Sequence, residues 1–130
     1  MKKRELRFEP GLKTARHKRF NEYLDGATIS PINVEISPTG RCNAKCDWCF
    51  YRQNPDIIKG LDGIDIKENA IEKLVKDFHQ FGVRSISWTG GGEPTLHPSF
   101  YKFVTWAYEE RIRQGLFTNG IGEMKFDTTK

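Results

Sequence analysis

Residues 32–49 read INVEISPTGRCNAKCDWC, and this stretch is the most informative part of the sequence for the fold. Its first part, residues 32–37, alternates apolar and polar side chains and includes β-branched residues, which predicts a β-strand. Pro38 and Gly40 then end the strand, and three cysteines follow within eight residues. The stretch therefore predicts a strand that leads directly into a loop rich in thiols.

A helix is the next element that the sequence predicts, after a polar loop over residues 54–63. Asp65 and Glu68 have the spacing of a capping box with an acidic N-cap, which predicts the start of the helix. Gly82 predicts its end. The apolar positions recur at helical spacing and form one face, which comprises Ile71, Leu74, Val75 and Phe78.

The remaining chain repeats this order. Residues 83–88 predict a second strand, and a second helix is expected from Pro98 to Gly115 with a stripe of apolar side chains. A short third strand is expected over residues 116–118. On the N-terminal side, residues 12–24 predict a short basic amphipathic helix, with Gly26 as its stop.

Alternation of strands and helices predicts an α/β fold with parallel strands and crossover helices. The loops that contain cysteines or glycines then lie together at the carboxyl ends of the strands, where α/β folds bind ligands. With 130 residues, the chain is long enough for one modest domain and too short for a complete β/α barrel. We expect residues 1–30 to form a basic leader and residues 31–130 the domain.

Composition and charge narrow the function classes. No apolar run approaches the roughly 20 residues of a membrane span, and the N-terminus does not resemble a secretory signal, so we expect a cytoplasmic protein. Residues 1–20 contain eight Lys or Arg and two Glu, whereas the rest of the chain has a net negative charge. This leader could contact RNA, but a solvated basic segment is the commoner explanation.

The three cysteines leave several alternatives open. No other cysteine exists in the chain, so a disulfide framework is excluded. Polar residues between the cysteines argue against three buried thiols that pack as small hydrophobes. A structural zinc site would need a fourth ligand, such as His79 or His97, at unusual spacing. A 4Fe-4S cluster held by three thiolates would leave one iron open to an outside ligand.

The segment CNAKCDWC resembles the cluster motif of the radical S-adenosylmethionine (radical SAM) superfamily. The resemblance implies that Cys42, Cys46 and Cys49 hold a 4Fe-4S cluster whose open iron binds S-adenosylmethionine. Trp48 matches an aromatic position whose backbone lies near the adenine of that cofactor, although it could simply shield the cluster from water. The implied fold is a partial (β/α) barrel of the radical SAM type with about three parallel strands.

Two further segments resemble the same family. Gly91, Gly92 and Glu93 match the motif that receives the methionine ammonium of the cofactor, and the physical chemistry agrees, since glycines allow carbonyls to approach and an ionised Glu93 would add a hydrogen bond. Thr118 and Asn119 resemble a segment at the end of the third strand that reaches the cofactor. Residues 12–37 also look like the corresponding segment of members that carry a C-terminal auxiliary-cluster (SPASM-type) domain.

The implied reaction is reductive cleavage of S-adenosylmethionine to a 5′-deoxyadenosyl radical, which abstracts hydrogen from an unknown substrate. We expect a peptide or small-molecule substrate more than nucleic acid, and an electron donor such as flavodoxin or ferredoxin. Three strands supply only the N-terminal half of a barrel, so we expect a truncated product or a fragment. The alternative is a non-catalytic iron-sulfur or zinc-binding fragment that needs a partner chain.

Overall fold

The computed structural model describes residues 18–61 and 63–121, and the chain divides into two compact units between Ser30 and Pro31. In the first unit, helix α2 (Lys18–Leu24) ends as expected at Gly26, which has a φ of 88°. The predicted residues 12–17 of this helix and most of the basic leader lie outside the described residues. Within the described part of the first unit, Arg19 donates a hydrogen bond to the carbonyl of Ser30 at 3.2 Å.

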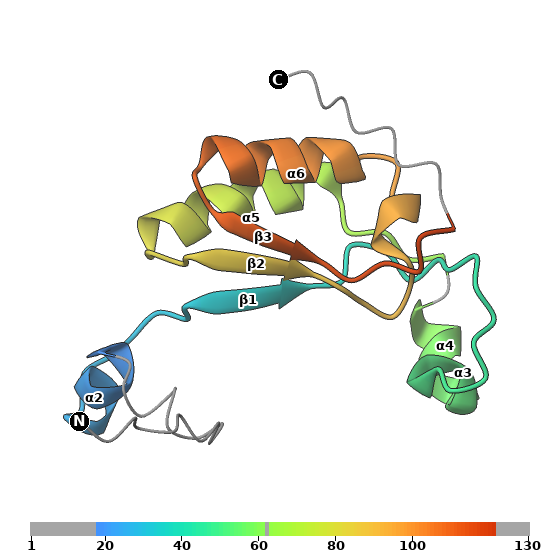
Figure 1. The fold of residues 1–130 in the computed structure, drawn as a ribbon, viewed down its shortest axis with the longest axis horizontal. Coiled ribbons are helices and arrows are strands. Elements are labelled where there is room, and N and C mark those ends of the chain that lie inside the picture. The colour runs from blue at the N-terminus through green and yellow to red at the C-terminus, as the bar shows by residue number, and fades with distance from the viewer. Residues whose placement is uncertain (1–17, 62, 122–130) are drawn as a thin grey trace, which may run out of the picture. The chain divides into compact units, whose positions relative to one another are not determined.

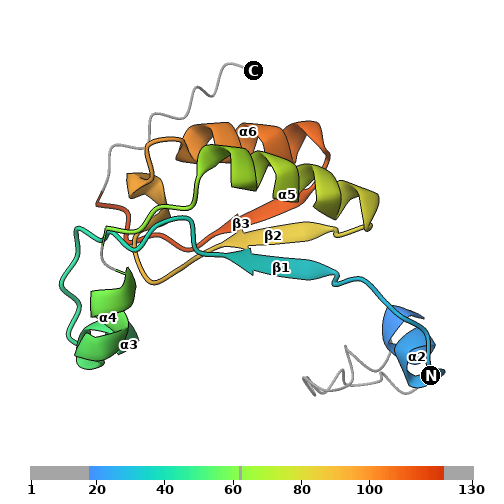
Figure 2. The same cartoon turned by 180° about the vertical axis from the view of Figure 1, so that it is seen from behind.

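The second unit is built on one sheet of three parallel strands in the order β1-β2-β3. The strands are β1 (Asn33–Ile36), β2 (Ser85–Trp88) and β3 (Arg113–Leu116). Helices α5 (Glu68–Gln80) and α6 (Phe100–Glu109) cross over between them and cover the same face of the sheet (Figures 1 and 2). The predicted α/β class and the three parallel strands are confirmed.

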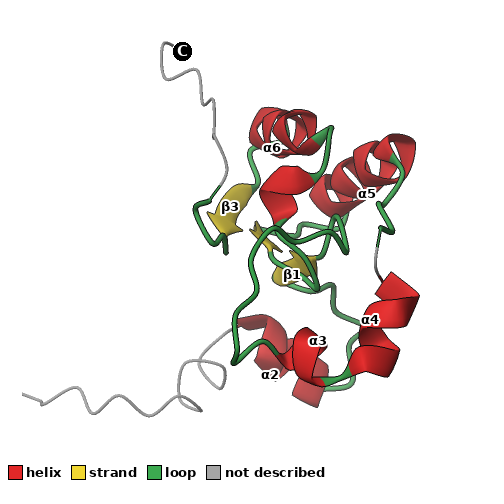
Figure 3. Cartoon of the chain, turned by 90° about the vertical axis from the view of Figure 1, so that its right-hand side faces the viewer, coloured by secondary structure: helices red, strands yellow, loops and turns green. Residues whose placement is uncertain are grey.

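The hydrophobic core lies between this face and the two helices. Alternate strand residues point into it, because successive side chains of a strand face opposite sides of the sheet. Seen along the sheet, both helices lie on one side of the strands (Figure 3). The side chains with the smallest exposure in this core are Ile71, Val75, Ile86, Trp88, Phe103 and Ala107.

The expected capping box at the start of α5 is wrong. Lys67 is the N-cap and makes no capping hydrogen bond with its side chain. Asp65 instead binds Thr39 and Arg41, and Glu68 accepts hydrogen bonds from Ser99 and Lys102. Partners distant in sequence thus take the two carboxylates that local spacing assigns to the cap.

The predicted end of α6 at Gly115 is also wrong, and so is the boundary of the third strand. The helix ends at Glu109, and Gly115 lies inside β3. Both α5 and α6 end in Schellman motifs, in which a left-handed residue follows the C-cap. Gly82 takes this position after α5 with a φ of 70°, whereas Arg111 takes it after α6 with a φ of 57°. A prediction that helices end at glycine therefore misses the end of α6.

Three short helices were not expected from the sequence. Helix α3 (Phe50–Gln53) follows Cys49 directly, and α4 (Pro55–Leu61) lies within the predicted polar loop. The 3-10 helix η1 (Pro94–Leu96) follows the glycine-rich loop. Its N-cap is Glu93, whose side chain accepts a hydrogen bond from the backbone of Thr95. No described helix is long and apolar enough to cross a membrane.

Candidate functional site

Three loops meet at the carboxyl ends of the strands, at the edge to which the arrows point in Figure 1. The first loop follows β1 and contains the cysteines, the second follows β2 and contains the glycines, and the third follows β3 and contains Thr118 and Asn119. Parallel strands with crossover helices place such loops at one edge. Direct hydrogen bonds between the loops, described below, support this predicted juxtaposition.

The cysteine-bearing segment, residues 42–63, is closed at its base by a pair of short backbone stretches. Thr39 and Asp65 form an isolated antiparallel bridge. The backbone N–H of Gly40 donates to the carbonyl of Ile64 at 2.8 Å, and that of Ile66 donates to the carbonyl of Pro38 at 2.9 Å. The residues that enter and leave the segment are therefore fixed side by side.

An ion pair strengthens this base. The guanidinium of Arg41 donates to both carboxylate oxygens of Asp65, at 3.2 and 2.6 Å, and the hydroxyl of Thr39 donates to Asp65 at 2.6 Å. Partial burial acts to raise the pKa of Asp65, but these hydrogen bonds and the positive charge of Arg41 outweigh burial and hold it below the ordinary value of 3.8. Arg41, which precedes Cys42, is thus held by an ionised carboxylate.

The glycine loop packs directly on this base. The backbone N–H of Glu93 donates to the carbonyl of Arg41 at 2.7 Å. A Cβ on Gly92 would lie 2.6 Å from the carbonyl oxygen of Thr39 and would overlap the carbonyl oxygen of Arg41. Only glycine fits there, because any side chain would push the two loops apart.

The carboxylate of Glu93 connects the second loop to the third. It is 3% exposed and accepts four hydrogen bonds, from the backbone and hydroxyl of Thr95, the hydroxyl of Thr118 and the backbone of Asn119, at 2.7–3.2 Å. Burial acts to raise the pKa of Glu93, but the hydrogen bonds outweigh it, and the pKa lies below the ordinary value of 4.5. Glu93 is therefore an ionised side chain that joins two loops, a function that the sequence did not predict.

The side chain of Asn119 extends the connection to the cysteines. Its amide nitrogen donates to the side-chain oxygen of Asn43 at 2.9 Å and lies 4.0 Å from the sulfur of Cys42. Since the backbone of Asn119 is bound by Glu93, one residue contacts both the glycine loop and the first cysteine. The predicted site residues Glu93, Thr118, Asn119 and Cys42 are thus brought together.

The three thiols are free, with Cys42 exposed and Cys46 and Cys49 partly buried. Among residues 18–61 and 63–121, no three His, Cys, Asp or Glu side chains are close enough together to hold a metal ion. The donor set nevertheless fits an iron-sulfur cluster, because three unpaired thiols lie on one accessible segment that is fixed at its base. Metal binding would require this segment to close around the cluster.

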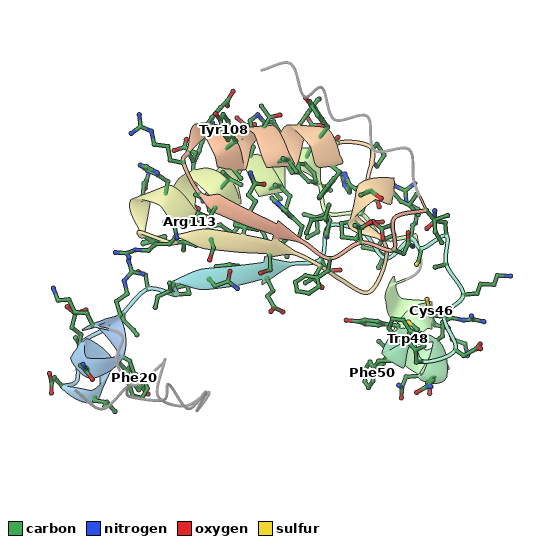
Figure 4. The ribbon with its side chains drawn as sticks, viewed as in Figure 1. Phe20, Cys46, Trp48, Phe50, Tyr108 and Arg113 are labelled. Carbon is green, nitrogen blue, oxygen red and sulfur yellow. The ribbon has the colours of Figure 1, made fainter. Side chains whose placement is uncertain are left out.

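Trp48 lies on the same segment, and Figure 4 shows it with Cys46 and Phe50 at the end of the unit that holds α3 and α4. Its side chain is 82% exposed. Its predicted position near a cofactor adenine remains a prediction. Thr39, Arg41 and Asp65 were missed as site residues, because only the position of Arg41 beside Cys42 is visible in the sequence, whereas its contact with Asp65 spans 24 residues.

Comparisons with known proteins identify the family and support the fold. The family model described as the radical SAM superfamily matches residues 36–127. The chain is 37% identical over 79 residues to the GTP 3′,8-cyclase of Chlorobaculum tepidum, which covers 61% of this chain and 22% of the relative. It is 32% identical over 83 residues to the tungsten-containing aldehyde ferredoxin oxidoreductase cofactor-modifying protein of Pyrococcus furiosus, covering 63% of this chain and 22% of the relative.

A probable GTP 3′,8-cyclase of Thermoplasma volcanium is 32% identical over 104 residues, which cover 75% of this chain and 28% of the relative. Among solved structures, BtrN in complex with AdoMet and 2-DOIA superposes with a TM-score of 0.56 at 22% identity, over 72% of this chain and 38% of BtrN, and so supports the fold. The chain spans less than a third of the length of these three curated relatives. On the match over residues 36–127, the chain belongs to the radical SAM superfamily.

Proposed function

We propose that Cys42, Cys46 and Cys49 hold a 4Fe-4S cluster whose fourth iron is open to S-adenosylmethionine. The observation that carries the proposal is the contact of all three loops at one sheet edge, where Asn119 reaches Cys42 and Glu93 binds Asn119. When bound, the cluster and S-adenosylmethionine would supply reductive cleavage to a 5′-deoxyadenosyl radical that abstracts hydrogen from a substrate. An external one-electron donor, such as a flavodoxin or ferredoxin, would reduce the cluster.

The chain's own residues would position the cofactor. The thiols of Cys42, Cys46 and Cys49 would bind as thiolates, and the backbone of Gly91 and Gly92 would approach the methionine ammonium, because neither residue carries a side chain. Thr118, Asn119 and Trp48 would form the rest of this surface. In the structure the Glu93 carboxylate is already hydrogen-bonded by protein groups, so we propose that it acts first by holding the loops and adds its negative charge at the ammonium.

The substrate is proposed here only by its chemical class. We favour a peptide or small molecule, and the relatives named as GTP 3′,8-cyclases make a nucleoside triphosphate one candidate. The chain spans under a third of the length of these relatives. We therefore propose that catalytic turnover requires a complete β/α barrel.

Anaerobic reconstitution with iron and sulfide tests the proposal, followed by electron paramagnetic resonance of the reduced protein with and without S-adenosylmethionine. We expect close to four irons per chain, a signal perturbed by the cofactor, and 5′-deoxyadenosine in the same sample. Cys46→Ser should abolish the signal, whereas Lys45→Ala, an exposed neighbour on the same segment, should retain it. Stoichiometric zinc without iron, or a signal that ignores the cofactor, would instead support a non-catalytic metal-binding fragment.

A further inference from the structure

The face of the sheet that α5 and α6 leave uncovered is polar, in contrast to the apolar face that they cover. The strand register places two rows of side chains on it. The row farther from the loops contains Asn33, Ser85 and Arg113, and the row nearer the loops contains Glu35, Ser87 and Gly115. Of the intervening strand residues, Ile36, Ile86 and Trp88 are buried in the core.

A polar face is unusual for a parallel sheet. Such sheets are commonly buried on both faces and then contain nearly continuous apolar strands. This face lacks the apolar side chains needed to pack a second helix layer, and it ends at the edge where the three loops meet. Because α/β folds bind ligands at that edge, the polar rows are suited to face a polar ligand.

The two rows differ in how far their polar groups are already bound. In the far row, the hydroxyl of Ser85 donates to the amide oxygen of Asn33 at 2.8 Å, and the amide nitrogen of Asn33 lies 3.4 Å from the hydroxyl of Ser87. In the near row, Glu35 is exposed, and its carboxylate has no hydrogen bond or ion pair within the described residues. A Cβ on Gly115 would meet nothing within 4 Å.

The near row therefore combines a carboxylate without a protein partner, a hydroxyl and open space. Glu35 and Gly115 flank Ser87 on either side, so they lie two strand spacings, about 10 Å, apart. This separation exceeds the width of one sugar ring, so such a molecule can lie on the exposed face between the two positions. The cation on this face, Arg113, belongs to the far row, so the charge nearest the loops is negative.

We propose that Glu35, assisted by Ser87, contacts the substrate and selects a neutral or cationic molecule rich in hydroxyl or amine donors over a phosphorylated one. This assignment rests on the proposed function, because it places the substrate beside the cofactor loops. The carboxylate accepts hydrogen bonds from hydroxyl and ammonium groups and repels phosphate oxygens. A nucleoside triphosphate, the candidate that the relatives named as GTP 3′,8-cyclases suggest, would bring its charges against Glu35, so this assignment disfavours it.

Three matched sugars test the assignment on the metal-free, isotope-labelled full chain. Glucosamine, glucose and glucose 6-phosphate share one sugar ring. At a pH of about 6.5, glucosamine is mainly cationic, glucose is neutral and glucose 6-phosphate is anionic. We expect glucosamine to shift the amide resonances of Glu35, Ser87 and Gly115 and to bind about threefold tighter than glucose, as for one exposed charge pair. Glucose 6-phosphate should leave these resonances unchanged.

Two variants separate the assignment from general charge effects. Glu35→Gln should remove the preference for glucosamine, whereas Glu109→Gln, which neutralises an exposed carboxylate on α6, should retain it. Equal binding of all three sugars, no shift with any of them, or a preference that survives Glu35→Gln would overturn the assignment. The sugar titration needs no cluster, so a negative result would overturn this assignment without affecting the proposed function. The proposed function is tested independently by electron paramagnetic resonance of the reconstituted chain.

Discussion

Replacing Glu93 with Gln tests whether this carboxylate holds the loops together. Its two oxygens accept four hydrogen bonds from Thr95, Thr118 and Asn119. In the variant, one oxygen becomes an NH₂ group. If the remaining oxygen keeps Thr95 and Thr118, the new amide faces the backbone N–H of Asn119, and two donors oppose each other. An unsatisfied buried donor costs about 1–3 kcal/mol, and the retained bonds lose the assistance of a charge.

We therefore expect Glu93→Gln to lower the free energy of unfolding by about 2–4 kcal/mol at pH 7. Urea unfolding followed by tryptophan fluorescence measures this value, because Trp88 is buried in the core beside the loops. Glu109→Gln is the matched control, since Glu109 is exposed and has no partner among the described residues, and it should change stability by less than about 0.5 kcal/mol.

The stability difference between the wild type and Glu93→Gln should depend on pH. The pKa of Glu93 is lower in the folded chain than its ordinary value of 4.5, so the ionised carboxylate stabilises the fold above that value. This contribution is lost as the pH falls below 4.5 toward the folded pKa. The difference between wild type and variant should therefore shrink in acid. Equal unfolding midpoints for Glu93→Gln and Glu109→Gln at pH 7 would refute the reasoning.

Three other perturbations have defined outcomes. Gly92→Ala should destabilise the chain by about 1–3 kcal/mol in urea, because the new methyl overlaps backbone carbonyls, whereas Gly60→Ala, with no atom within 4 Å of the new methyl, should not. Asp65→Asn should lower the free energy of unfolding by about 1–2 kcal/mol and speed tryptic cleavage within residues 42–63. The control Asp77→Asn, which breaks an exposed ion pair within α5, should lower it by about 0.5 kcal/mol or less and leave the cleavage rate unchanged. Chelation of iron from the reconstituted chain should leave the far-ultraviolet circular dichroism of the chain largely unchanged, because the sheet, α5 and α6 form a core without the metal, and unfolding on chelation would contradict this.

Local periodicity predicted the elements whose burial repeats regularly. The apolar face of α5 is confirmed by Ile71 and Val75, and the alternation in residues 32–37 by the buried Ile36 of β1. Leu74, at the margin of the predicted face, is 38% exposed. The second helix shows the limit of such rules, because its end depends on Arg111 in a conformation that glycine usually adopts. Nothing in the local pattern marks that residue.

The site was predictable in its parts but not in its connections. Topology alone places the loops that follow parallel strands at one edge, so the sequence sufficed to group the cysteines with Gly91, Gly92 and Glu93. The connections depend on contacts across the fold. Glu93 binds groups 25 and 26 residues away, and Arg41 binds a carboxylate 24 residues away. Such pairs leave no spacing pattern in a single sequence.

The base of the cysteine-bearing segment and the thiols on it differ in how the structure holds them. The base of the cysteine-bearing segment and the glycine loop are fixed by backbone bonds and by the buried Glu93, while the thiols themselves are free. Among the side chains that the structure describes, none of the core residues belongs to residues 42–63. Closure of the segment around a metal centre can therefore draw on metal–thiolate bonding without disturbing the sheet. A fixed edge beside a segment that contains three unpaired thiols supports the proposed cluster, in which one iron would stay open.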